Sequence, residues 1–415
     1  MVKRTCGLIG ILLCQIQFSN AQELVPAESV GMSTPALAQA TVRLQKHIDD
    51  GEIAGVVAAV MRDGKLVYFE SRGHLNLEND KPMQADALFR IYSMTREITS
   101  SAVLKLYEEG KFRLDDPIKM YLPEFENQRV LLDSSSTDIS QTKSRTGDIT
   151  VANLLTHTSG LGSRSSALYT ANNVRDKNIT LDQMASNAAR VPLFQDPGTE
   201  FRYGIHATIL GKLIEVWSGQ SFEDYLQENI LDPLQMNGTM FWAEGENAER
   251  LAELYRPTDG VLKPYKIESV PWTSRPTLIE GGVGLLSTVP DFLKFSQMVL
   301  DKGKFRGRTI LAEETAALMY QNGVPDQAMP IGERGYWLGS GWTLGGFNLV
   351  MDPTHYNFPV STGTIWWDGS AATRYFIDPK QSMVIVIMAQ VSPSSGGGFR
   401  ENFSELVDKA IIERR

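Results

Sequence analysis

The chain has 415 residues, of which 42% are hydrophobic and 21% charged, so it is long enough for one large domain or two intimate ones with a sizeable core. Its formal net charge of −9 argues against a nucleic-acid binder, because such proteins carry a basic surplus. Beyond residue 20 no apolar run is long enough to span a bilayer, so we expect no membrane span.

The first 21 residues have the pattern of a cleavable secretory signal peptide. Lys3 and Arg4 precede an apolar run, and small residues end at Ala21. We therefore predict a signal peptide over residues 1–21 and a periplasmic or secreted mature protein. Lipid anchoring at Cys14 is an alternative that the sequence leaves open. Both cysteines lie in this segment, so the mature chain would contain neither a disulfide nor a thiol nucleophile.

Helix and strand patterns alternate in the next part of the chain. Apolar residues at helical spacing predict a helix over 34–49, and two strands are expected over 54–61 and 65–71. Asp63-Gly64 between the two strands is the signal of a tight hairpin turn. The sequence therefore predicts a helix followed by a β-hairpin.

The stretch 88–100 organises the rest of the chain. A strand-like segment ends at Tyr92, and Ser93 opens a predicted helix over 93–109. A serine at a helix start lies beside free N–H groups and the positive end of the helix dipole, which suits a nucleophile whose attack creates an oxyanion. Arg96 falls on the same face one turn later. Serine is also a common N-cap, so this segment alone leaves both interpretations open.

Helical patterns dominate the middle of the chain, and strand patterns return at its end. Since strands lie at both ends and helices between them, we expect one sheet built from both termini with a large helical insertion. The predicted helices are 149–155, 181–190, 205–219, 221–230, 290–300, 313–319 and 401–412, and the predicted late strands are 337–344, 371–377 and 383–389.

The domain boundaries follow from this order. Residues 22–100 and 285–415 are predicted to form the sheet domain, and residues 101–284 a mainly helical domain. The active site is expected at the interface between them.

Four stretches, taken in order and spacing, resemble the serine β-lactamase-like hydrolases. Within that group the chain is similar to class C β-lactamases and, more closely, to family VIII carboxylesterases, over residues 30–412. The resemblance implies an α+β fold of the β-lactamase/transpeptidase type, with an antiparallel sheet flanked by helices. The four stretches are Ser93-Met94-Thr95-Arg96, 154–161 (LLTHTSGL), 201–205 (FRYGI) and 366–370 (WWDGS).

The resemblance also implies roles for single residues. Ser93 would be the acylated serine. Tyr203 opens the family's Y-x-N motif and would accept the serine proton. The backbone N–H groups of Ser93 and Ser370 would form the oxyanion hole. The third motif supplies the expected substrate contacts Trp367, Asp368 and Gly369. Independently of the resemblance, His206 is a further candidate for a substrate contact, since it follows Tyr203 by three residues; its alternative is a packed or exposed helical histidine.

Arg96 departs from the family, which has lysine at that position. Arginine keeps the positive charge and could hold the pKa of Tyr203 well below about 10, but it cannot give up its proton. We therefore expect Tyr203 to act as the sole general base and Arg96 to act as electrostatic support. Asp368 stands where the esterases usually have glycine. It could pair with Arg96, or strand alternation could point it away.

The expected reaction is hydrolysis of a small-molecule ester through an acyl-enzyme on Ser93. Trp367 replaces the lysine that grips a β-lactam carboxylate, which favours a neutral ester. The alternatives are β-lactamase or D-Ala-D-Ala peptidase-type activity on an amide, or a catalytically impaired binding homologue. Aromatic residues outside the core would give a wide apolar pocket.

No cofactor or metal is expected. No spacing of histidine and acidic residues resembles a zinc site, and the chain has neither G-x-G-x-x-G nor a P-loop. A glycine-rich segment, Gly281-Gly282-Val283-Gly284, resembles the family's turn beside the pocket, or is a tight turn with positive φ. The sequence does not decide the oligomeric state.

Overall fold

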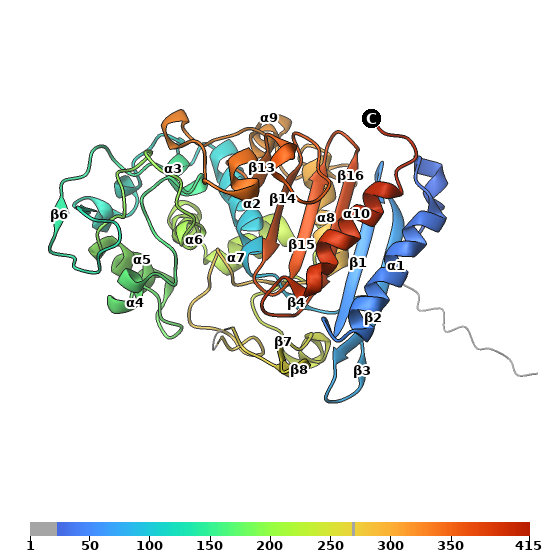
Figure 1. Cartoon of the computed structure of the whole chain (residues 1–415). Helices are drawn as coiled ribbons and strands as arrows, with labels where there is room; N and C mark the ends of the chain where they lie inside the picture. The colour runs from blue at the N-terminus through green and yellow to red at the C-terminus, as the bar shows by residue number, and fades with distance from the viewer. Residues whose placement is uncertain (1–22, 268–269) are drawn as a thin grey trace, which may run out of the picture.

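The computed structural model describes residues 23–267 and 270–415 (Figure 1). The predicted signal peptide, residues 1–21, lies outside the described residues. Within the described ranges, none of the helices is both long enough and apolar enough to cross a lipid bilayer.

An eight-stranded sheet forms the centre of the molecule, in the order β12-β13-β14-β15-β16-β1-β2-β3. All neighbouring strands run antiparallel. β1 (Gly55–Arg62) pairs with β16 (Met383–Ala389), so strands from opposite ends of the sequence meet, and the predicted fold class is confirmed. The other strands are β2 (Lys65–Asn76), β3 (Lys81–Pro82), β12 (Ser340–Trp342), β13 (Asn348–Val350), β14 (Ile365–Gly369) and β15 (Thr373–Asp378).

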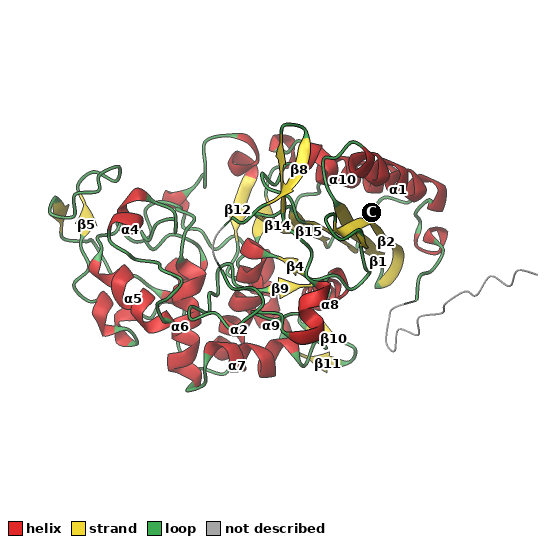
Figure 2. Ribbon diagram, turned by 90° about the horizontal axis from the view of Figure 1, so that it is seen from below, coloured by secondary structure: helices red, strands yellow, loops and turns green. Residues whose placement is uncertain are grey.

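Helices cover both faces of this sheet (Figures 1 and 2). α1 (Thr34–Asp49) and α10 (Phe399–Lys409) pack together on one face, and α2 (Thr95–Glu108) and α8 (Val289–Leu300) lie on the other. Every residue of β1 and of β16 is buried, which explains why both strands read as continuous apolar runs. Successive side chains still alternate between the two hydrophobic cores, so neighbours in a strand serve different faces.

The helical insertion lies beside the sheet, at the left of Figure 1. α6 (His206–Ser218) contacts α2 and three helices of the insertion. Those and the remaining short helices are α3 (Val151–Leu155), α4 (Ala167–Ala171), α5 (Leu181–Arg190), α7 (Phe222–Leu226) and α9 (Glu313–Ala317). Four small hairpins or strand pairs complete the fold: β4 (Phe89–Arg90) with β9 (Leu286–Ser287), β5 (Val130–Leu131) with β6 (Thr142–Lys143), β7 (Tyr255–Thr258) with β8 (Val261–Pro264), and β10 (Lys304–Phe305) with β11 (Arg308–Thr309).

Short helical turns account for several differences from the sequence-based boundaries. The predicted strand over 337–344 is a 3-10 turn followed by the three residues of β12. The helix predicted over 221–230 is α7 continued by a π-helical turn. The turns are Ala27–Val30, Tyr92–Met94, Ile118–Met120, Pro123–Phe125, Gly245–Arg250, Leu318–Tyr320, Asp326–Ala328, Gly335–Gly339, Pro353–His355 and Gly396–Gly398 (3-10), and Gln227–Leu231 (π).

Candidate active site

A cavity of about 240 Å³ lies where the start of α2, the segment before α6 and the end of β14 come together. Ser93, Arg96 and Ser370 line it together with Tyr203, so the cavity gathers residues from sequence positions more than 270 apart. The other lining residues are Ser163, Arg164, Ser165, Gly204, Ile205, Thr208, Glu280, Gly282 and Val283.

Ser93 lies in a tight turn between β4 and α2. The helix α2 begins only at Thr95, and Ser93 belongs to the preceding 3-10 turn, whose residue Tyr92 has a positive φ of 41°. Neither this turn nor α2 has a side-chain cap hydrogen bond, so the N-cap interpretation of Ser93 is wrong. A non-glycine residue with a positive φ directly before Ser93 is typical of a functional turn.

Gly369, at the end of β14, packs against this turn. A Cβ at Gly369 would lie 2.4 Å from the carbonyl oxygen of Ile91, so only glycine lets the strand come so close. Because Ser370 follows directly, the close approach brings Ser370 to the same cavity as Ser93. Gly369 therefore acts in backbone packing and is not among the residues that line the cavity.

Tyr203 stands between the serine, the arginine and an indole. The Ser93 side chain lies near enough to its hydroxyl to lower the pKa of Tyr203. The indole Nε1–H of Trp367 donates to the Tyr203 oxygen at 2.7 Å. The guanidinium carbon of Arg96 lies 4.2 Å from the centroid of the Tyr203 ring. The structure thus brings together the three residues predicted to carry the chemistry, and it places Trp367 against Tyr203 rather than on the cavity wall.

Arg96 is only 5% exposed, and its contacts are weak ones. Its guanidinium donates to the Ser93 carbonyl at 3.4 Å and to the Gly204 carbonyl at 3.5 Å, while its Nε has no partner. Burial lowers the pKa of Arg96, and the nearby Tyr203 opposes that shift. Arginine remains charged under these conditions, so Arg96 is a fixed cation beside the phenol.

The pKa of Tyr203 does not follow the sequence-based expectation. Burial raises it above its ordinary value, and this effect outweighs the lowering by Arg96, the Ser93 hydroxyl and Trp367. The predicted lowering of the Tyr203 pKa, which would have kept the tyrosine ionised in the resting protein, is therefore wrong, because the net shift is upward. In the free protein Tyr203 is a phenol, and its ionised form is a minor species at neutral pH.

Asp368 lies on the opposite face of β14 from Trp367, as strand alternation requires. Its carboxylate is 3.1 Å from Arg374 and 3.3 Å from Arg400, on the side covered by α10. The structure therefore does not place Asp368 in contact with substrate, and its ion pairs are made away from Arg96.

His206, the first residue of α6, is also directed away from the cavity. It is fully buried and its Nδ1 lies 2.8 Å from Nδ1 of His157. His206 is absent from the cavity wall, so the expected substrate contact is replaced by an internal hydrogen bond.

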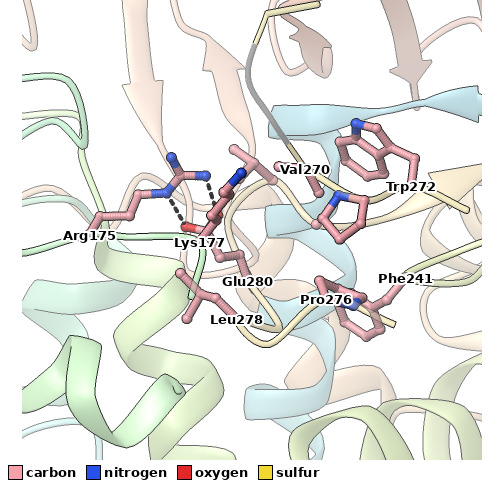
Figure 3. A pocket seen from close by; sticks show the side chains of 11 residues that line it. Arg175, Lys177, Phe241, Val270, Trp272, Pro276, Leu278 and Glu280 are labelled. Carbon is pink, nitrogen blue, oxygen red and sulfur yellow. Dashed lines mark hydrogen bonds and ion pairs between the residues drawn. The ribbon is translucent and has the colours of Figure 1, made fainter. Parts of the chain in front are cut away.

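The cavity is more polar than the sequence suggested. None of the aromatic side chains expected to form an apolar pocket is among its lining residues. Instead, serines 163 and 165 and Arg164 form one side, and they come from a loop with no recognisable pattern. Glu280, buried at the rim, makes a bidentate ion pair with Arg175 (Figure 3). The aromatic residues considered, of which most were expected in the core and the remainder in the pocket, are Tyr169, Trp242, Trp272, Tyr336, Trp337, Trp342, Trp366 and Trp367.

The glycine-rich segment 281–284 borders the cavity through Gly282 and Val283. The segment does form a turn at residues 281–283, but none of its glycines has a positive φ, so the expected positive φ is wrong. A Cβ at Gly281 would lie 2.4 Å from the carbonyl of Ala207, which shows that close packing against α6 selects glycine there. A second cavity of about 20 Å³, beyond Glu280, is large enough for about one water (Figure 3). Within the described residues, no group of three or more His, Cys, Asp or Glu side chains could hold a metal ion.

The fold and the serine at the head of a buried helix are those of the β-lactamase/transpeptidase class of serine hydrolases. The family model described as Beta-lactamase matches residues 40–406, and the chain belongs to this family. It is 29% identical over 363 residues to Protein Rv1367c of Mycobacterium tuberculosis strain ATCC 25618 / H37Rv, covering 86% of this chain and 90% of that one.

Two further relatives carry descriptions of activity. Esterase EstB of Burkholderia gladioli is 27% identical over 367 residues, covering 82% of this chain and 86% of that protein. The solved structure of EstCE1, described as a hydrolase with promiscuous acyltransferase activity, superposes with a TM-score of 0.76 at 25% identity, covering 91% of this chain and 99% of that one.

Proposed function

We propose that this protein is an exported serine hydrolase that cleaves small carboxylic esters through an acyl-enzyme on Ser93. The observation that carries the proposal is that Ser93 and Tyr203 share the wall of one cavity of about 240 Å³, with the Arg96 cation over the tyrosine ring. The pattern of residues 1–21 supports export.

Acylation begins when the Ser93 oxygen attacks the ester carbonyl carbon. Its proton passes to the ionised form of Tyr203, since Arg96 has no basic form to offer. The N–H groups of Ser93 and Ser370 face the developing oxyanion and stabilise it. The carbon–oxygen bond to the alcohol then breaks, and Tyr203 returns the proton to the departing alkoxide.

Deacylation follows the same path in reverse. Tyr203 takes a proton from water, the water oxygen attacks the acyl carbon, and Ser93 leaves with the proton. The role of Arg96 and of the Trp367 N–H is to stabilise the phenolate against the cost of burial. Because phenolate is scarce at neutral pH, activity is expected to be low near pH 7 and to increase as the pH becomes alkaline.

The volume and the polar wall of the cavity favour small substrates with polar groups. A volume of about 240 Å³ is below the usual range for drug-sized ligands, and serines, Thr208 and charged side chains form much of its wall. We therefore expect acetyl and propionyl esters to be better substrates than long-chain esters. The relative described as Esterase EstB supports an ester rather than a lactam.

Intact-mass spectrometry tests the proposal directly. Wild-type protein exposed to p-nitrophenyl acetate or to a fluorophosphonate probe should gain one adduct, located on Ser93, and Ser93→Ala should gain none. A chromogenic cephalosporin hydrolysed faster than the short esters would favour β-lactamase or peptidase activity instead. Absence of any adduct on the folded wild type would identify an impaired, binding-only homologue.

A further inference from the structure

Two histidines are buried side by side directly behind Tyr203. His157 and His206 are at most 2% exposed, and their Nδ1 atoms lie 2.8 Å apart. Two nitrogen atoms at this distance share one hydrogen, so one ring must donate and the other accept.

The donor can be identified from a third group. The backbone N–H of Gly204 points at His157 Nδ1 at 3.4 Å, so that nitrogen is an acceptor. His206 therefore carries its hydrogen on Nδ1, and His157 carries its hydrogen on Nε2. Burial, followed by repulsion from neighbouring cations, holds the pKa of both rings low, at about 3 for His206, so the pair is neutral near pH 7.

His157 contacts the backbone on both sides of Tyr203. Its carbonyl accepts the N–H of Arg202 at 2.8 Å, and its ring nitrogen faces the N–H of Gly204. Its ring centroid lies 4.7 Å from that of Tyr203. His157 has a positive φ of 57°, a conformation that the surrounding contacts must hold in place.

Close packing holds the segment that bears Tyr203 in place. A Cβ at Gly204 would lie 2.1 Å from the carbonyl of Gly162, so the segment bearing Tyr203 is pressed onto the loop that follows His157. Trp342 closes the other side, 5.1 Å from the His157 ring and 5.6 Å from Tyr203. The tyrosine ring is thus positioned by a histidine that is itself oriented by His206.

We propose that His157 and His206 form a positioning pair in which a hydrogen bond from His206 to His157 holds the 202–204 segment so that the Tyr203 hydroxyl stays at Ser93. This inference rests on the proposed function for its kinetic consequence. Neither histidine touches the reacting atoms. Their effect on rate is exerted through the placement of Tyr203.

The test compares His206→Leu with His206→Asn. Leucine fills the site without a donor, whereas the asparagine amide can supply an N–H near the position of Nδ1. For p-nitrophenyl acetate we expect His206→Leu to lose on the order of 100-fold in kcat with little change in KM, because a misplacement of about 1 Å has that effect. His206→Asn should recover at least about tenfold of the loss.

A double-mutant cycle separates positioning from general damage. In a Tyr203→Phe background, His206→Leu should not reduce the residual acylation rate further. His47→Leu is the matched control, since His47 is also buried but lies in α1. It should lower thermal stability without changing kcat. Equal losses of kcat from His206→Leu with and without Tyr203 would overturn the inference.

A measurement independent of activity completes the test. In protein labelled with ¹⁵N-histidine, long-range ¹H–¹⁵N spectra should show an Nδ1–H tautomer for His206 and an Nε2–H tautomer for His157, both unchanged between about pH 5 and 9. Titration of either ring in that range would refute the pair. Wild type that is never acylated on Ser93 would refute the proposed function, and the spectra would still decide the pair.

Discussion

Replacing Arg96 by glutamine removes the cation above the Tyr203 ring and keeps a side chain of similar length. The guanidinium carbon lies 4.2 Å from the ring centroid. Taking about 5 Å as the separation between the guanidinium and the phenolic oxygen, two unit charges interact by about 3 kcal/mol at an effective dielectric constant of about 20. Since one pKa unit corresponds to about 1.4 kcal/mol, the pKa of Tyr203 should rise by about two units.

The expected consequence is a loss of ionised tyrosine in the same proportion. In Arg96→Gln, kcat/KM for p-nitrophenyl acetate should fall about 100-fold near pH 8, because the base form becomes about 100-fold scarcer. Arg96→Lys is the matched control. It restores a positive charge and should retain activity within about tenfold of wild type or exceed it. Circular dichroism should show that both variants are folded.

The result that would refute this reasoning is a folded Arg96→Gln whose kcat/KM stays within about threefold of wild type across the alkaline range. The cation would then have no effect on the base. A loss shared equally by the lysine variant would point to the shape of the guanidinium rather than to its charge.

Three further changes test the site and its support. Because burial raises the pKa of Tyr203, wild-type kcat/KM should increase about tenfold per pH unit from about pH 7 to 9, and Tyr203→Phe should abolish this slope in the same stopped-flow assay. Burial also raises the pKa of Glu97 to about 8, so the folded state binds this proton more tightly than the unfolded state does. Its stabilising effect is complete below about pH 4.5 and is lost as the pH rises through 8. Melting temperatures should therefore depend less on pH in Glu97→Gln than in wild type. Asp368→Asn removes the carboxylate that Arg374 and Arg400 share and leaves Glu401 as the remaining ion-pair partner of Arg374. It should cost about 2 kcal/mol in urea unfolding, while Ser93 labelling persists.

Local pattern was sufficient for much of the fold. The runs that form β1 and β16 are apolar and short, and the turn Asp63-Gly64 has the positive φ values that a tight hairpin requires. The order of strand and helix signals predicted one sheet built from both ends of the chain, whereas the pairing of β1 with β16 in particular was not predicted. The short hairpins and 3-10 turns were harder to foresee, because tertiary contacts rather than periodicity define them.

The candidate site was predictable only in its principal members. The motif resemblance named Ser93, Arg96 and Tyr203, and the structure places these three together. The direction of the Tyr203 pKa shift depends on burial, which a sequence does not reveal. The face of the sheet on which the Asp368 side chain lies depends on the register of β14. The wall formed by residues 163–165 comes from a loop without periodicity, so no sequence signal marked it.

The pairing of β1 with β16 has a consequence for the synthesis of the chain. β1 is complete after residue 62, yet the strand beside it is made only when residue 389 has left the ribosome. Until then one edge of an apolar strand has no hydrogen-bonding neighbour, which is the condition that favours aggregation. We therefore expect a nascent chain of this protein to need protection by chaperones for most of its translation, and the cavity that Ser93 shares with Ser370 to form only at the end.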